Sequence, residues 1–379
     1  MDRRSMLRLS LSAAAAACLE LTGTQKALAF SDTSAFAKGV DVSTLPQIEA
    51  FGGKFYSGGV RHDALALLRY NGADSCRIKI WNDPGNASYY PSNQAVAGYN
   101  TVAQAVALAK RAAALGMRIL IDFHYSDWWV DPSKQYPPHA WAGLNLTDTC
   151  TQLYAFTTDA LNQLKAAGVT PEWVQVGNEI TSGMLWPLGK YDQLDNLATL
   201  LKTGYNAVKS VNSATKVILH LDSGGNNATS RWWFDAMTSR GVQFDVIGLS
   251  YYPAWQGSLT DLTNNVNDIA VRYDKALMVV ETAFAWTTSD GDSEPDTMTT
   301  AGTTGFPMTP AGQVEFWQAV KNIIANIPGG RGKGVFWWEP EWIPVAGAGW
   351  KAGAGDEWDN CTLFDFHGNA LSSISLFKS

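Results

Sequence analysis

Two glutamates, each at the end of a short apolar run, are the side chains in this sequence best suited to chemistry. Glu179 ends the run 173–179, and Glu281 ends the run 277–281. Each run has the character of a buried strand, and the chain becomes polar after each acid. Two carboxylates at the carboxyl ends of parallel strands fit a retaining glycosidase, in which one acid donates a proton and the other attacks the sugar. Because the two lie far apart in the sequence, only a fold could bring them together.

The elements that must position these acids alternate along the chain. Candidate strands are the apolar runs 39–42, 75–81, 118–123, 173–178, 216–221, 244–250, 277–281 and 334–338. Stretches with apolar residues every three or four positions follow most of them and predict helices, such as 101–115, 149–167, 194–211, 259–273 and 310–327. This alternation predicts an α/β fold, a single closed (β/α)8 TIM barrel, with a doubly wound open sheet as the alternative. Long loops follow the third, seventh and eighth strands, at 126–145, 286–309 and 340–360.

The length and composition of the chain fit one secreted barrel domain. Of its 379 residues 46% are hydrophobic, which supports a large core, and we assign residues 30–379 to a single catalytic barrel. The net charge of −7 argues against nucleic acid as a partner. Residues 1–29 have the pattern of an export signal peptide, and Arg3 and Arg4 also match a twin-arginine signal. We therefore expect a secreted or periplasmic monomer without a membrane span.

The cysteines leave one pairing open. Cys18 would be removed with the signal, and Cys76 lies in a strand-like run that predicts a buried free thiol. Cys150 and Cys361 could form a disulfide in an oxidising compartment.

Polar and aromatic side chains gather at the strand ends around the two glutamates. Asn178 could bond the sugar 2-hydroxyl, Arg77 and a tyrosine could hold the nucleophile ionised, and Trp338 could form the floor under the reacting sugar. Each also has a structural reading as a helix cap, ion pair or core residue, but their coincidence favours a binding site. The candidate substrate-binding residues are Asp41, Arg77, His124, Asp127, Trp128, Asn178, His220, Asp222, Tyr252 and Trp338. Since His124 and His220 are not spaced as metal ligands on a helix, we expect no catalytic cofactor.

Seven sequence blocks carry a family resemblance. The blocks are 38–43, 122–128 with 131–135, 176–180, 248–253, 280–283, 336–340 and 363–365, and together they resemble glycoside hydrolase family 53, the arabinogalactan endo-β-1,4-galactanases. The resemblance covers nearly the whole chain after the signal. It implies a (β/α)8 barrel that cuts β-1,4-galactan side chains of pectin, with Glu179 as acid/base and Glu281 as nucleophile. Lys79 is a departure, because the family usually has an arginine there and lysine cannot make the same bidentate contact.

Alternatives to this function remain at this stage. Another retaining barrel glycanase, such as a β-mannanase or β-glucanase, would use the same pair of acids, and a non-catalytic carbohydrate-binding protein could share the scaffold. The abundant tryptophans suit a protein that stacks on sugars. Candidate outer subsites are Trp128, Trp129, Trp141, Trp255 and Trp342, with loop packing as the other reading.

An acidic loop after the seventh strand is a candidate metal site. Asp290, Asp292 and Asp296 alternate in a loop that contains a glycine, a pattern that suits Ca²⁺. The family resemblance implies a structural calcium here in some bacterial members. A solvated acidic loop is the alternative.

Overall fold

The computed structural model describes residues 34–85, 98–351 and 353–379. The expected signal peptide at 1–29 lies outside the described residues. Within these residues, none of the helices is both long and apolar enough to cross a membrane.

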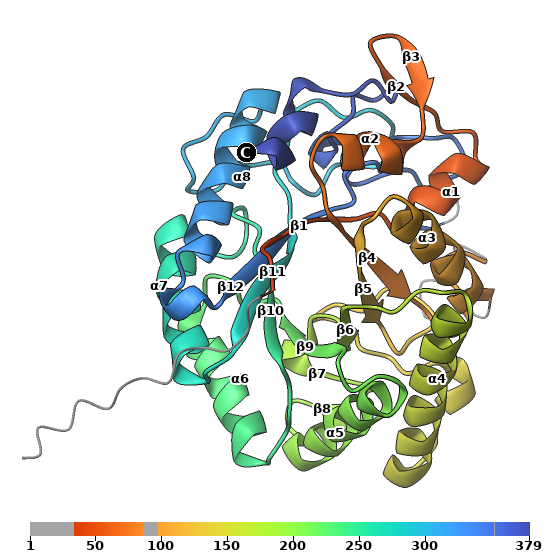
Figure 1. The fold of residues 1–379 in the computed structure, drawn as a ribbon, viewed down its shortest axis with the longest axis vertical. Coiled ribbons are helices and arrows are strands. Elements are labelled where there is room, and N and C mark those ends of the chain that lie inside the picture. Colours follow the sequence, from red (N-terminus) through yellow and green to blue (C-terminus); the bar gives the residue numbers. More distant parts are fainter. Residues whose placement is uncertain (1–33, 86–97, 352) are drawn as a thin grey trace, which may run out of the picture.

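In the described part of the chain, eight parallel strands close into a barrel surrounded by helices (Figure 1). Around the barrel the order is β1, β12, β11, β10, β9, β6, β5 and β4, and pairing of the first strand with the last closes the sheet. The predicted TIM barrel is confirmed, and the open-sheet alternative is wrong. The barrel strands are β1 (Ala37–Asp41), β4 (Ser75–Ile80), β5 (Arg118–Phe123), β6 (Trp173–Val176), β9 (Lys216–Leu221), β10 (Val246–Ser250), β11 (Ala276–Thr282) and β12 (Gly332–Trp338).

Two short antiparallel pairs lie outside the barrel. They are β2 (Phe55–Ser57) with β3 (Val60–His62), and β7 (Gly183–Met184) with β8 (Gly189–Lys190). The second pair follows the strand that ends near Glu179, so it belongs to the loops around the barrel mouth.

The helices cover the outside of the barrel and begin at polar caps. Thr309 accepts a hydrogen bond from the Gly312 amide at the start of α8, and Pro310 lies in the first turn. Ser258 and Asp261 form a capping box at the start of α7. The helices are α1 (Leu45–Ala50), α2 (Ala64–Tyr70), α3 (Val102–Ala114), α4 (Leu146–Ala166), α5 (Leu194–Val211), α6 (Asn227–Ser239), α7 (Leu259–Arg272) and α8 (Pro310–Ala325). The C-terminal segment Ser372–Lys378 packs beside α8 (Figure 1).

The barrel interior changes from apolar to polar along the strands. One buried cluster, separate from the core beneath the helices, contains Ala37, Leu120, Trp173, Ile218, Val246, Ala276, Met278, Val280 and Phe336. These residues occupy alternate strand positions, so they share the inner face of the sheet. Phe336 packs directly against the backbone of Gly39, where a Cβ atom would lie 2.1 Å from the phenyl ring. Continuing the same alternation leads to polar residues at the carboxyl ends, including Arg77, Asp122 and Gln175.

The cysteines do not form the disulfide considered from the sequence. Cys76, Cys150 and Cys361 are all free thiols. Cys361 is buried with its Sγ 3.6 Å from Met298 Sδ, whereas Cys150 lies in α4. The possible Cys150–Cys361 pair is therefore wrong, and Cys76 is the buried thiol that the sequence predicted.

Candidate active site

A cleft of about 380 Å³ opens at the carboxyl ends of the barrel strands, and both glutamates line it. This is the end at which TIM barrels carry their active sites. The other lining residues come from strand ends and from the loops after β5, β10 and β12, and they are His124, Trp129, Val130, Asp131, Lys134, Asn178, Tyr252, Trp255, Trp338, Trp342, Trp350, Glu357 and Trp358. The cleft is thus acidic in its centre and aromatic along its walls.

A strained turn presents Glu179 to the cleft. Glu179 has φ +46° and ψ +50°, a left-handed conformation that non-glycine residues seldom adopt. Gly177, two residues earlier, has φ +91°, and a Cβ there would lie 2.6 Å from Ile180 Cγ2. Strain of this kind persists where surrounding structure enforces it and is frequent at functional sites.

An irregularity in strand pairing presents Glu281. Along β10 and β11, Leu249 pairs with Val279, but Ser250 pairs with Glu281, so β11 gains one residue at this point. Strict alternation would give the inner face to Val280 and Thr282 and would point Glu281 outward. The bulge re-aims the carboxylate into the barrel mouth.

Ser250 bridges the two acids. Its hydroxyl donates to Glu179 Oε1 at 2.6 Å and lies 3.5 Å from Glu281 Oε2. These two oxygens are therefore separated by no more than about 6.1 Å, whereas the carboxyl groups of an inverting pair are ~6.5–9.5 Å apart.

Arg77 is the centre of a buried charge cluster around Glu281. Its Nη2 lies 2.7 Å from Glu281 Oε1 and 3.0 Å from Asp122 Oδ2, and it donates to Asn178 Oδ1 at 2.9 Å. Its Nη1 donates to Asp41 Oδ2 at 2.6 Å. The guanidinium is 1% exposed, so these contacts act with little screening by water.

The surroundings separate the two glutamates by proton affinity. Burial raises the pKa of both carboxyls. For Glu179 the nearby charges of Glu281 and Asp222 raise the pKa further, whereas for Glu281 the guanidinium of Arg77 opposes the effect of burial. When the pair carries one proton, that proton therefore resides on Glu179. Tyr252 supports this by donating to Glu281 Oε2 at 3.2 Å, and burial raises its own pKa well above the ordinary value.

The two histidines are neutral members of the polar network. Burial lowers the pKa of His124 and lowers that of His220 further. The indole of Trp81 donates to His124 Nδ1 at 3.1 Å, so the imidazole proton is on Nε2, 3.0 Å from Asp122 Oδ2. His220 Nε2 lies 2.9 Å from Ser250 Oγ, which connects it to Glu179.

Several residues predicted from the sequence to contact substrate lie behind the cleft wall instead. Arg77, Asp41 and His220 are buried and reach the cleft only through other side chains. Asp127 accepts from the amides of Asp83 at 2.8 Å and His139 at 2.7 Å, so it anchors the loop after β5.

Trp128 and Asp222 are also absent from the cleft lining. Trp128 is 3% exposed and stacks on Trp350 with 5.7 Å between ring centroids. Asp222 accepts a bond on its backbone oxygen from Gln256 Nε2 at 2.6 Å. His124, Asn178, Tyr252 and Trp338 do line the cleft.

The aromatic walls differ in part from the expectation. Trp129, Trp255 and Trp342 line the cleft, and Trp255 is 53% exposed. Trp141 is buried against Phe156 in the core, with 6.0 Å between ring centroids. Three further residues line the cleft and were not expected from the sequence, although all lie in the long loop predicted at 340–360: Trp350, Glu357 and Trp358.

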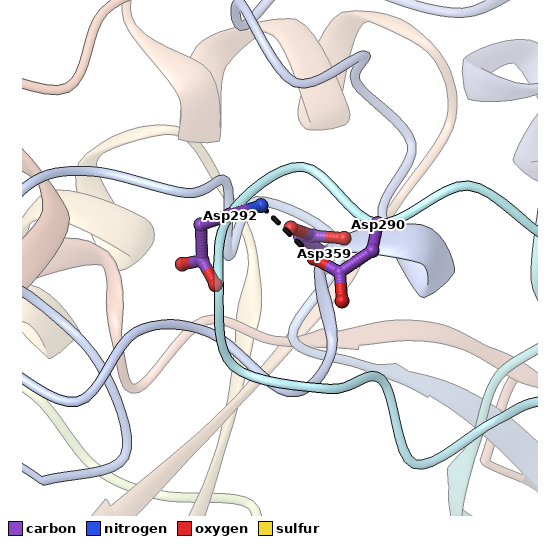
Figure 2. Close-up of side chains that lie close together, drawn as sticks. All are labelled: Asp290, Asp292 and Asp359. Atoms are coloured by element: carbon purple, nitrogen blue, oxygen red, sulfur yellow. Dashed lines mark hydrogen bonds between the residues drawn. The ribbon is translucent and has the colours of Figure 1, made fainter.

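The acidic loop gathers a different set of carboxylates from the one predicted. Asp290 and Asp292 approach Asp359, which comes from the loop after β12, and one oxygen of each lies within 4.8 Å of the others (Figure 2). Asp296 is not in this group. Among the described residues this is the one cluster of His, Cys, Asp or Glu side chains that meets such a spacing.

The buried part of this region has unsatisfied oxygens. Asp296 Oδ1, Asp356 Oδ2 and Asp359 Oδ1 are buried without a hydrogen-bond partner. Burial raises the pKa of Asp359 to about 8 and that of Asp296 to about 7, and the charge of Asp296 adds to the first shift whereas that of Asp290 adds to the second. Unpaired carboxylate oxygens in a buried acidic region fit a hard cation with oxygen ligands, such as Ca²⁺.

Comparison with known proteins agrees with this geometry. The model of the family described as glycosyl hydrolase family 53 matches residues 37–377. A solved structure described as the Ignisphaera aggregans GH53 catalytic domain superposes with a TM-score of 0.85 at 39% identity, covering 90% of this chain and 95% of that one.

Two similar relatives carry names that state an activity. An endo-beta-1,4-galactanase of Bacillus subtilis is 35% identical, covering 90% of this chain and 85% of the relative. An arabinogalactan endo-beta-1,4-galactanase of Humicola insolens is also 35% identical, covering 90% and 98%. With a family match over nearly the whole described barrel, and with a pair of close carboxylates at its mouth, the chain belongs to glycosyl hydrolase family 53.

Proposed function

We propose that this protein is an endo-β-1,4-galactanase that cleaves the galactan or arabinogalactan side chains of pectin with retention of configuration. The observation that carries the proposal is the pair of cleft carboxylates, which are bridged by Ser250, closer than an inverting pair and unequal in proton affinity. The names of the Bacillus subtilis and Humicola insolens relatives support the choice of substrate.

Glu281 is the nucleophile in this proposal. Its carboxylate attacks the anomeric carbon as the bond to the leaving oxygen breaks, which forms a covalent glycosyl-enzyme. Arg77 at 2.7 Å and the Tyr252 hydroxyl at 3.2 Å orient the carboxylate and favour its ionised form.

Glu179 is the acid/base. It gives its proton to the departing glycosidic oxygen, and in the second step it takes a proton from the water that attacks the anomeric carbon and frees Glu281. Asn178 lines the cleft beside it and is held by Arg77, in a position suited to the sugar 2-hydroxyl.

The aromatic walls bind sugars on either side of the reacting bond. Trp338 serves as the floor under the reacting sugar, and the exposed ring of Trp255 is an outer subsite. Flat apolar faces of galactose can stack on these rings, which favours an extended chain over a single sugar.

Product analysis tests the proposal. We expect the protein to release short oligosaccharides from unbranched galactan, more slowly from arabinogalactan, and not from β-mannan or β-glucan. Glu281→Gln keeps the size and polarity of the side chain and should lose nearly all turnover. Release from mannan or glucan instead would assign a different glycanase, and absence of any turnover would favour a carbohydrate-binding protein.

We also propose that the acidic region around Asp359 holds a structural Ca²⁺. Asp290, Asp292 and Asp359 would supply ligands, and the ion would neutralise the unpaired buried oxygens nearby. We expect Ca²⁺ to raise the melting temperature, Mg²⁺ to do so much less, and Asp359→Asn to abolish the difference. An equal melting temperature in Ca²⁺ and in chelator would contradict the site.

Export is a further part of the proposal. It is supported by the basic start and apolar segment of residues 1–29. The protein recovered from the periplasm or the medium should begin near residue 30, as N-terminal sequencing would reveal. Lys in place of both Arg3 and Arg4 should block export if the twin-arginine route is used.

A further inference from the structure

Lys79 is a buried charge that the proposed reaction does not use. It lies two residues after Arg77 on the inner face of β4, and its side chain is 1% exposed. Its Nζ lies 2.6 Å from Glu339 Oε1, and Glu339 is completely buried. A buried ion pair of this kind contributes little net stability compared with apolar residues of similar size, so stability alone does not account for it.

The partner carboxylate is fixed firmly in place. Glu339 Oε2 accepts from the Thr44 amide at 3.0 Å and from the Thr44 hydroxyl at 2.6 Å. The Glu339 amide donates to the backbone oxygen of Asp41 at 3.0 Å, and its φ of +48° holds the chain in a left-handed turn. Because Glu339 directly follows Trp338, this anchoring also fixes the backbone that carries the cleft floor.

The other side of the ammonium faces tryptophan. Lys79 Nζ lies 3.9 Å from the ring centroid of Trp129 and 5.7 Å from that of Trp338. Both rings line the cleft, and they contact each other edge to face at 6.0 Å. A desolvated cation this close to an indole is strongly attracted to its face.

We infer that Lys79, held by Glu339, is a positioning residue that fixes Trp129 and Trp338 for sugar binding. The inference rests on the proposed function, since it assigns these rings to sugar subsites. The ammonium joins a rigid anchor on one side to two cleft tryptophans on the other, so its loss should free the rings without removing any group that reacts.

The consequence for binding has a definite size. Loss of the desolvated cation–π contact that Lys79 makes with the two tryptophans should weaken sugar binding about tenfold. The chemical step should change little, since Glu179 and Glu281 keep Ser250, Arg77 and Tyr252, and Lys79 lowers the pKa of Glu281 less than Arg77 does.

Two variants test the inference. Lys79→Met alone leaves Glu339 buried and unpaired and can fail to fold, so the informative variant is Lys79→Met with Glu339→Gln, in which the amide oxygen still accepts from Thr44. Lys79→Arg is the conservative control, because guanidinium both pairs with carboxylate and stacks on indole.

We expect the KM of the double variant for galactan to be about tenfold higher than that of wild type, with kcat within about twofold. The KM of Lys79→Arg should stay close to the wild-type value. Calorimetric binding of β-1,4-galactotetraose in a Glu281→Gln background should show the same loss of affinity. An unchanged KM in the double variant, or a fall in kcat with KM unchanged, would overturn the inference while the galactanase assignment stands. Failure of the wild type to cleave galactan would overturn the proposed function and this inference with it.

Discussion

Replacing Ser250 with alanine should move the alkaline side of the pH–rate profile to higher pH. The Ser250 hydroxyl donates to Glu179 Oε1 at 2.6 Å, a bond that favours the ionised carboxylate and so lowers the pKa of Glu179. Without it the acid holds its proton to higher pH. A hydrogen bond of about 1 kcal/mol corresponds to a shift of the alkaline limb of kcat/KM by about half to one pH unit.

The same change should lower stability for a separate reason. Ser250 is buried and its Oγ lies 2.9 Å from His220 Nε2, so alanine leaves that nitrogen without this partner. The expected loss in the free energy of unfolding is about 1–3 kcal/mol, measured by urea denaturation.

Ser373→Ala provides a matched control. Ser373 is also buried, and its hydroxyl donates to Gln313 Oε1 at 2.6 Å beside α8, away from the cleft. It should lower stability similarly and leave the pH profile unmoved. An unmoved or downward-shifted alkaline limb in Ser250→Ala, or an equal shift in Ser373→Ala, would refute the role given to Glu179.

Three other predictions follow from the site. Trp255→Ala should raise KM for long galactan about three- to tenfold with kcat unchanged, because the ring is 53% exposed in the cleft, and equal KM values would remove it as a subsite. Asp122 has a pKa lowered to about 2, chiefly by Arg77 against the opposing effect of burial, so its contribution to stability is present above about pH 4 and lost toward pH 2. Between about pH 4 and pH 2, the free energy of unfolding of wild type should therefore fall by about 2 kcal/mol more than that of Asp122→Asn, as measured by urea denaturation. Equal falls in the two proteins would contradict the lowered pKa of Asp122. Glu179→Gly should be nearly inactive, and added azide should restore its turnover of an aryl β-galactobioside with a β-glycosyl azide as the product. An α-glycosyl azide as the product would exclude Glu179 as the acid/base.

The barrel could be predicted because its strands are buried on both faces. Such strands form continuous apolar runs, and the runs 118–123 and 216–221 coincide with β5 and β9. Helix α6 is harder to recognise. Trp232, Trp233 and Phe234 are consecutive in it, which blurs the helical spacing of apolar residues.

Only the part of the site that lies at the ends of strands could be predicted from the sequence. The positions of Glu179 and Glu281 follow from the ends of their apolar runs, but the bulge that turns Glu281 inward depends on pairing with β10. Asp127 was expected to contact substrate because it lies in a strand-end motif, yet it accepts from the amides of Asp83, in the loop after β4, and of His139, farther along its own loop. Asp359 likewise joins Asp290 and Asp292 from a distant segment, and contacts of this kind are not encoded in local spacing.

In a retaining reaction Glu281 should form a covalent intermediate with the sugar. The most direct measurement is mass spectrometry of peptides from protein inactivated with a 2-deoxy-2-fluoro β-galactobiosyl fluoride, which slows release of the intermediate. We expect Glu281 to carry the label and proton NMR to detect the β-anomer as the first product. A label on another residue, or an α-anomer as the first product without any labelling, would contradict it.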